Sequence, residues 1–213
     1  MANATHEWWE VVARDGTRYR LGWNPDSEQL AFMPGYSCTV GSPCTTPAFP
    51  YDGMGYAGTG AGVVALRWRV DRVLERHGNF MTHAYTEETR TVSSVTFDRA
   101  SYLASTRYTG HQDSGGTVDL QPGYGVRFTL AGRPGDLPEG GLSLWETLDS
   151  QLLDRIEVCY GTCATGTIVR SYDLSYDVLP AVGPGGTLVL TGITLSSGGF
   201  TEAALAGCGK KPC

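Results

Sequence analysis

The tetrapeptide Asp113-Ser114-Gly115-Gly116 matches the local pattern around the nucleophile of a serine protease. Such a serine attacks a carbonyl carbon only when a histidine accepts its proton and a carboxylate orients that histidine. His111 is close in sequence, but the cysteine and histidine context of those proteases is missing, and no GxSxG elbow is present. Because the four residues also form a good turn, we interpret them as a turn. A small hydrolase based on Ser114 and His111 is the least favoured hypothesis.

Two histidines flank a predicted hairpin turn and could bind a metal ion. His77 and His83 are six residues apart, so their side chains could approach each other across two strands, with Glu75 or Glu87 nearby. The spacing does not match the HExxH pattern of zinc enzymes. We therefore expect His77 in the turn and His83 facing solvent or a tyrosine, and we predict no metal site and no cofactor.

Carboxylate pairs could support glycoside hydrolysis, which needs two carboxyl groups on either side of a bound sugar. The available pairs are Glu7 with Glu10, Glu87 with Glu88, and Asp173 with Asp177. Adjacent strand residues point to opposite faces of a sheet, so Glu87 and Glu88 cannot face one sugar. The pair Asp173 and Asp177 shares a face and is typical of a solvated surface. We predict no catalytic residue; if the chain is an enzyme, a glycosidase is favoured over a serine hydrolase.

Large aromatic residues on the predicted strands are a candidate ligand-binding surface. The residues are Trp8, Trp9, Trp23, Trp68 and Tyr85. Core packing is the default for large aromatic side chains in strands. An exposed row of these rings would instead form a platform for sugar rings, so carbohydrate is kept as an alternative ligand.

The six cysteines form three close pairs, which are Cys38 with Cys44, Cys159 with Cys163, and Cys208 with Cys213. Glycine, proline or small residues lie within each pair and can bring the two Cα atoms to disulfide distance. Zinc fingers usually combine two close pairs, whereas these pairs lie far apart in the sequence. We predict three local disulfides, with metal binding and free thiols as alternatives. Disulfides imply an extracytoplasmic, secreted location.

The composition favours β-structure with many turns. The 213 residues include 29 glycines, 11 prolines, 11 tyrosines and 5 tryptophans. The net charge is -6 and the basic residues are scattered, which argues against nucleic acid as a partner. No apolar run is long enough to span a membrane, and residues 1–10 lack the pattern of a signal peptide. We expect one β-rich domain over residues 1–213, excised from a longer secreted protein.

Strand-turn-strand signals recur along the chain and predict consecutive antiparallel hairpins. Hairpins are expected over residues 6–23 and 66–88, and further strands over 91–97, 102–108, 124–130, 155–158, 168–178 and 188–195. Asp98-Arg99-Ala100 is expected to separate two of these strands, and a short helix is expected over 144–153 and a terminal loop after 195. Five prolines and a glycine-rich run predict a long insertion over 24–62 without a long regular strand. The expected fold is all-β, an open spiral or a sandwich, with at most one short helix.

The ordered segments resemble a known family. They are WEVVARDGTRYRLGW, WRVDRVLERHGNFMTHAYTEE, YLASTRYTG, LLDRIEV, VRSYDLSYDV and LVLTGITL. In this order they look like a stretch of large secreted RHS/YD-repeat proteins, as in SpvB-like proteins and the B components of insecticidal toxin complexes. The resemblance covers nearly the whole chain except residues 24–62. It implies a β-rich wall whose hairpins spiral into a hollow shell around a toxic C-terminal polypeptide, with no catalytic residue in the shell strands.

The resemblance predicts a non-catalytic structural or interaction scaffold. Its partners would be other segments of the parent protein or another copy of the chain. A carbohydrate-binding or carbohydrate-active domain is the alternative. A fragment of this length cannot close a cage, so we expect it to close on itself as a sandwich or to pair its exposed edges.

Overall fold

The computed structural model describes residues 7–33, 62–92, 95–133, 150–179, 187–197 and 200–205. Apart from the single 3-10 turn η1 (Pro25–Ser27), all regular structure in these residues is β-strand. The strands are β1 (Trp9–Val12), β2 (Arg18–Leu21), β3 (Glu28–Met33), β4 (Gly62–Trp68), β5 (Val70–Leu74), β6 (Asn79–Val92), β7 (Val95–Gln112), β8 (Val118–Leu120), β9 (Tyr124–Gly132), β10 (Gln151–Tyr160), β11 (Thr167–Leu179), β12 (Thr187–Ser197) and β13 (Phe200–Leu205). The all-β prediction is confirmed. The described part of the chain contains no helix that is long and apolar enough to cross a membrane.

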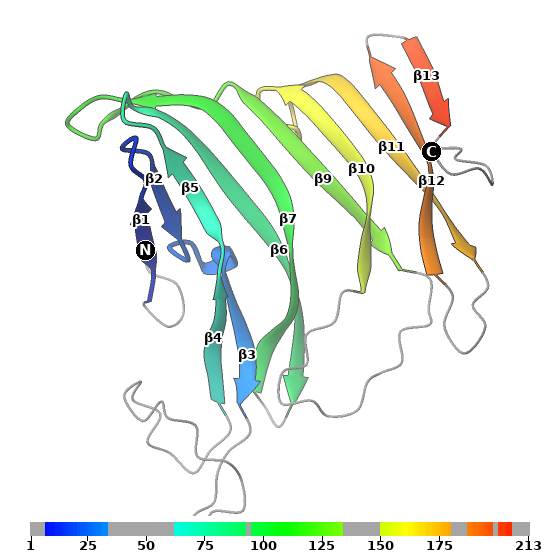
Figure 1. The fold of residues 1–213 in the computed structure, drawn as a ribbon, viewed down its shortest axis with the longest axis horizontal. Helices are drawn as coiled ribbons and strands as arrows, with labels where there is room; N and C mark the ends of the chain where they lie inside the picture. Colours follow the sequence, from blue (N-terminus) through cyan, green and yellow to red (C-terminus); the bar gives the residue numbers. More distant parts are fainter. Residues whose placement is uncertain are drawn as a thin grey trace, which may run out of the picture.

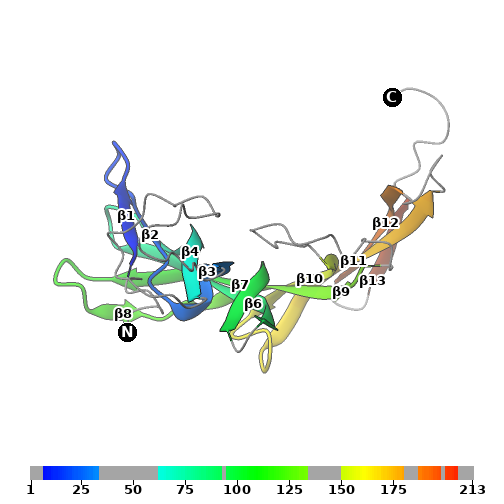
Figure 2. The ribbon, with the colours of Figure 1, turned by 90° about the horizontal axis from the view of Figure 1, so that it is seen from below.

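The main sheet has eleven strands, and they follow the chain closely. Its order is β1-β2-β5-β6-β7-β9-β10-β11-β12-β13, with β8 attached to β7, and every pair is antiparallel. Figure 1 shows this progression from the N-terminal edge to the C-terminal edge. The sheet is open, because β1 and β13 stand at the two ends of the order. In Figure 2 it appears as a curved band.

A second, two-stranded sheet of β3 and β4 packs against the N-terminal half of the main sheet. The chain leaves the main sheet after β2 and returns to it as β5. Backbone amides join the layers: Leu30 N donates to Asp98 Oδ2 at 2.6 Å, and Tyr85 N donates to Asp26 Oδ2 at 2.8 Å. We call β1–β7 the two-layered half and β9–β12 the single-layered half, because no described element packs against a face of the latter (Figure 2).

The six-residue strand β3 lies within residues 24–62, a stretch for which no long regular strand is expected. Its sequence, EQLAFM, contains neither proline nor glycine, since Pro25 and Pro34 lie just outside it. It pairs with β4, from Glu28 opposite Trp68 to Met33 opposite Gly62. The prolines therefore delimit the strand instead of preventing it.

Three predicted boundaries are wrong. Residues 98–100 do not separate two strands but belong to the long β7, where Asp98 and Ala100 are buried against the second layer. Residues 151–153 are strand instead of helix, since β10 pairs there with β9 in the register Leu152 opposite Ala131; residues 144–149 lie outside the described part. The expected terminal loop contains β13, which pairs with β12. In each case cross-strand pairing overrides the local signal.

The buried residues of the described part are more polar than those of an ordinary core. The buried apolar side chains are Ala31, Phe80, Phe97, Ala100 and Cys159, whereas the buried polar ones are Ser27, Glu28, Gln29, Asp71, Asp98, Ser101 and Glu157. All of these except Cys159 and Glu157 lie in the two-layered half. That half is therefore held together by hydrogen bonds to buried polar groups as well as by apolar contact.

Candidate functional site

Three glycine turns of one type gather at one end of the two-layered half, at the upper left of Figure 1. In each turn the first amide N–H donates to the carbonyl oxygen four residues later: Ala13 to Thr17 (2.8 Å), Glu75 to Asn79 (2.8 Å) and Asp113 to Thr117 (2.9 Å). The fourth residue of each turn has a left-handed φ: Gly16 (+88°), Gly78 (+91°) and Gly116 (+85°). The protease-like tetrapeptide is thus the third copy of this turn. Its Asp113 carboxylate accepts the Thr117 amide at 2.8 Å, so it stabilises the turn.

His111 and Ser114 line one open cleft of about 640 Å³ between these turns. His111 Nδ1 lies 2.7 Å from Asp119 Oδ1, and His111 Nε2 lies 3.1 Å from the carbonyl oxygen of His77. The hydrogen bond to Asp119 raises the pKa of His111. Because both ring nitrogens face acceptors, the imidazolium form satisfies the site and neither nitrogen is left to accept a proton from Ser114. The geometry therefore favours the turn interpretation over a hydrolase.

The two hairpin histidines have separate surroundings. His77 lies in the turn and is exposed, as expected. His83 is half-buried, and its Nδ1 lies 2.9 Å from Thr106 Oγ1 on β7, so the expectation that it faces solvent or a tyrosine is wrong. Burial lowers the pKa of His83. Within the described residues, no group of three His, Cys, Asp or Glu side chains could hold a metal ion.

The predicted tryptophans form two edge-on pairs in the two-layered half. The ring centroids of Trp8 and Trp23 are 5.0 Å apart, and those of Trp9 and Trp68 are 5.9 Å apart. Trp68 also packs on Gly22, where an added Cβ would lie 2.3 Å from Trp68 Cδ1. Trp8 is 43% exposed and Trp9 is 57% exposed. If this cluster binds a sugar, the exposed rings of Trp8 and Trp9 would stack on it.

Tyr85 packs where the two layers meet. It is half-buried, and its hydroxyl donates to the carbonyl oxygen of Val70 at 2.7 Å. The Arg69 guanidinium lies 5.5 Å from the centre of its ring. Burial raises the pKa of Tyr85. These contacts use both the hydroxyl and the ring, so Tyr85 is a weak candidate for ligand binding.

Asp71 is the anchor of the loop that precedes β3, and the sequence analysis did not identify it. Its carboxylate is fully buried. The groups that donate to it are Arg20 Nε (2.6 Å), Trp23 N (2.7 Å), Asn24 N (3.1 Å) and Ser27 Oγ (3.1 Å). These contacts fasten residues 20–27 to β5. The sequence gives one indication of this anchor: Asp71 is a charged residue in the strand segment VDRVL, which is otherwise largely apolar.

Glu87 lies in an acidic cluster between the two layers. Its pKa is raised to about 7, mainly by burial and also by the charges of Asp98, Asp26 and Glu28, while the charge of Arg69 lowers it. Asp98 and Glu28 are 6% and 1% exposed, so a substrate has no access to a carboxyl pair here. The cluster supports a role in packing the layers, and not in glycoside hydrolysis.

The other predicted carboxylate pairs are also separated by their contacts. Glu88 accepts a hydrogen bond from Ser150 Oγ and lies 3.7 Å from the Arg99 guanidinium, away from the acidic cluster that surrounds Glu87. Asp173 forms an ion pair with Arg155, and the exposed Asp177 accepts from the amide of its neighbour Val178. None of these pairs forms two free carboxyl groups facing one sugar.

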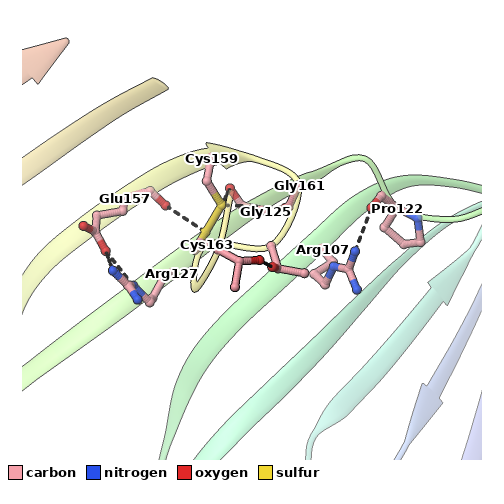
Figure 3. Close-up of a disulfide and its surroundings, with 10 residues drawn as sticks. Arg107, Pro122, Gly125, Arg127, Glu157, Cys159, Gly161 and Cys163 are labelled. Atoms are coloured by element: carbon pink, nitrogen blue, oxygen red, sulfur yellow. Dashed lines mark hydrogen bonds and ion pairs between the residues drawn. A yellow bond between two sulfur atoms is a disulfide. The ribbon is translucent and has the colours of Figure 1, made fainter. Parts of the chain in front are cut away.

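One face of the single-layered half is charged and carries a disulfide (Figure 3). Arg127 Nε donates to Glu157 Oε2 at 2.6 Å across β9 and β10. Cys159 and Cys163 are bonded, with their Cα atoms 5.3 Å apart, as predicted for this pair. Gly125 permits the close approach, because an added Cβ would lie 3.1 Å from Cys159 Sγ. The cysteines at 38, 44, 208 and 213 lie outside the described residues.

The opposite face of the single-layered half is apolar. The register aligns Phe128, Ile156, Tyr172 and Leu195 in one row across β9–β12. Because residues opposite one another share a face, Val126 and Val158 continue it in the next row, where Arg170 stands opposite Val158. Exposed apolar side chains elsewhere on this face include Tyr160 (60%), Val178 (42%) and Leu190 (37%). Within the described part of the chain, no second layer covers this face.

Three tyrosines form a ladder at the end of the apolar face. Tyr124 stands opposite both Tyr108 and Tyr160, and the rings of Tyr108 and Tyr124 are stacked with centroids 5.8 Å apart. The ring of Tyr160 meets Tyr124 edge-on at 5.4 Å. The stacked rings turn their faces toward each other, so they stabilise neighbouring strands instead of offering a flat platform. The sequence analysis missed this ladder because it depends on register.

Comparison with known proteins gives a likeness of fold. No family model matches the chain, and no curated protein matches it. A similar solved structure is that of the N-terminal domain of effector protein SpvB from Salmonella typhimurium strain LT2. The TM-score is 0.51 and the sequence identity is 13%, over 92% of this chain and 62% of that chain. The chain thus shares an SpvB-like fold and spans less than two thirds of that structure's length.

Proposed function

We propose that the chain is a non-catalytic wall segment of a larger, secreted RHS/YD-type protein, which works by packing against other segments of its parent. The carrying observation is the apolar face of β9–β12, which no described element covers. An apolar sheet face is stable in water only when another layer packs on it. In the proposed parent, that layer comes from outside the described residues.

The likeness to the SpvB domain supports this proposal. The chain covers 62% of that domain, so the neighbour contains additional structure that has no counterpart here. The strands also follow one another almost in chain order, and both ends of the main sheet are open. Such a sheet can be extended at either edge by further strands of the same protein.

The proposal can be tested with paired substitutions on the two faces of the single-layered half. Val178→Glu combined with Leu190→Glu should reduce binding of an apolar fluorescent dye several-fold while leaving the urea midpoint nearly unchanged. Thr129→Glu, on the exposed charged face, is the matched control and should change neither quantity. Unchanged dye binding, or unfolding caused by the double substitution, would contradict an accessible apolar face.

Carbohydrate binding is a second candidate, favoured only by the exposed Trp8 and Trp9. Electrophoresis through gels containing soluble polysaccharides tests it. Retardation that disappears in Trp9→Ala would support this function. Equal mobility with and without every polysaccharide would remove it.

A further inference from the structure

The strand β1 is an open edge of the main sheet among the described strands. It is the first strand of the main sheet, and β2 is its partner among the described strands. Trp9, Val11 and Val12 are 57%, 54% and 58% exposed. The strand is short and carries one charged residue, Glu10, but it contains no lysine, proline or bulge that would block a further strand. The edge is therefore a template for another strand.

The hydrogen bonds of the first turn determine which backbone groups face this edge. Ala13 N donates to Thr17 O, so the backbone of Ala13 faces β2. Successive residues of a strand direct their N–H and C=O groups to alternate sides. The groups of Val11 therefore also face β2, whereas those of Glu10 and Val12 face the open edge.

A second copy of β1 fits this edge around a two-fold axis. Opposite residues of an antiparallel pair must share a face and a hydrogen-bonding type. A pairing centred on Glu10 would place two like charges opposite each other, which is destabilising. A pairing centred on Val11 places each Glu10 opposite Val12 of the other copy, so that both outward-facing residues exchange hydrogen bonds.

Side chains on one face of the hairpin favour the same arrangement. Val11 stands opposite Tyr19, which is 37% exposed, and both share a face with Trp9. Pairing around Val11 joins this apolar patch to the identical patch of the second copy. Such an isologous contact closes after two copies, whereas pairing of β1 with β13 would be head-to-tail and could continue indefinitely.

We propose that two copies of this chain associate through antiparallel β1–β1 pairing with Val11 opposite Val11. The contact joins two main sheets into one. It occupies the β1 edge, so strands of the parent would extend the main sheet at its β13 edge, and the apolar face of β9–β12 stays uncovered by this contact.

Sedimentation measurements over a range of concentrations test the association. The unmodified chain should form a dimer. Val11→Lys places two like charges at the two-fold axis and should weaken the dimer by about tenfold or more, a loss of about 1.4 kcal/mol. Val118→Lys, in the exposed β8, is the matched control and should leave the dimer unchanged. A monomer at every concentration, an open-ended polymer, or equal effects of both substitutions would overturn the proposal.

Cysteine cross-linking tests the register. Facing residues of a non-hydrogen-bonded antiparallel pair have Cα atoms about 4.5 Å apart, within the range of a disulfide. Val11→Cys should therefore form a covalent dimer under mild oxidation, whereas Val12→Cys, opposite Glu10 of the other copy, should not. Equal or reversed cross-linking would overturn the proposed register.

Discussion

The two-layered half and the single-layered half are built from similar antiparallel strands but are stabilised differently. In the first, β3 and β4 cover part of the main sheet, and buried carboxylates join the layers. In the second, ion pairs and one disulfide occupy one face while the other remains apolar and uncovered by described elements. Strand composition alone therefore does not determine whether a sheet forms a closed core.

The insertion between β2 and β5 is the source of this difference. It leaves the main sheet, supplies the second layer, and is anchored by Asp71 and Asp98. No corresponding excursion among the described residues folds over β9–β12. The comparison shows that the first half packs internally, whereas no described element covers the apolar face of the second.

The largest expected effect is loss of the anchor in Asp71→Ala. Removal of the carboxylate leaves the Arg20 guanidinium without its partner and leaves buried donors of the loop unsatisfied. The free energy of unfolding, measured with urea, should fall by about 3 kcal/mol. Asp154→Ala, an exposed carboxylate in the single-layered half, is the control and should change it by about 0.5 kcal/mol or less. Equal losses of stability in Asp71→Ala and Asp154→Ala would contradict the special role of the buried carboxylate in the two-layered half.

The next effect concerns the disulfide of the single-layered half. Replacing Cys159 and Cys163 by serine releases a closed loop with a sequence separation of 4. The loss of loop constraint should lower the free energy of unfolding by about 2 kcal/mol. Reduction of the unmodified protein should produce at least this loss, because it also breaks any other disulfide of the chain. If neither treatment changes the urea midpoint, the disulfide does not stabilise this half.

A smaller effect is expected at Glu87, whose pKa is raised to about 7 from the usual 4.5 of a glutamate side chain. A raised carboxyl pKa means that the folded state binds the proton more tightly than the unfolded state does. Stability should therefore fall as pH rises from about 4.5 to 7, by about 1 kcal/mol after allowance for partial solvent exposure. Glu87→Gln should remove this dependence, whereas the exposed Glu75→Gln should preserve it. The same pH slope in both variants would contradict the acidic cluster between the layers.

The smallest effect is a difference in pKa between His111, at the glycine turns of the two-layered half, and the half-buried His83. The hydrogen bond with Asp119 raises the pKa of His111, whereas burial lowers the pKa of His83. The contribution of His111 is present at low pH and is lost as pH rises through its raised pKa. NMR titration should give a higher pKa for His111 than for His83, and Asp119→Asn should lower the pKa of His111. A lower pKa for His111 than for His83 would contradict the contacts described for these two side chains.

The sequence predicts local structure well where a glycine determines it. Asp15-Gly16 and His77-Gly78-Asn79 correctly mark hairpin turns because each needs a residue with positive φ. The prolines around β3 predict an irregular segment, whereas in the structure they only mark the two ends of a strand. Asp98 misleads for another reason: its burial depends on Leu30, which lies 68 residues away in the sequence.

The candidate sites are less predictable because they depend on register. The sequence identifies the tryptophans but not their pairing, which requires β1, β2 and β4 to be placed together. It identifies the alternating face of β11 but not whether another layer covers it. The prediction for Cys159 and Cys163 succeeds because that contact is local. The predictions of a secreted location and of one domain over residues 1–213 stay predictions.

Oxidative footprinting by hydroxyl radicals, read by mass spectrometry, tests the difference between the halves most directly. Phe128 and Tyr172 on the apolar face should oxidise at a substantial fraction of their rates in the unfolded chain. Phe80 and Phe97, which are 8% and 2% exposed in the two-layered half, should be strongly protected. Protection of Phe128 and Tyr172 equal to that of Phe97 would show that the chain covers this face itself and would contradict the account.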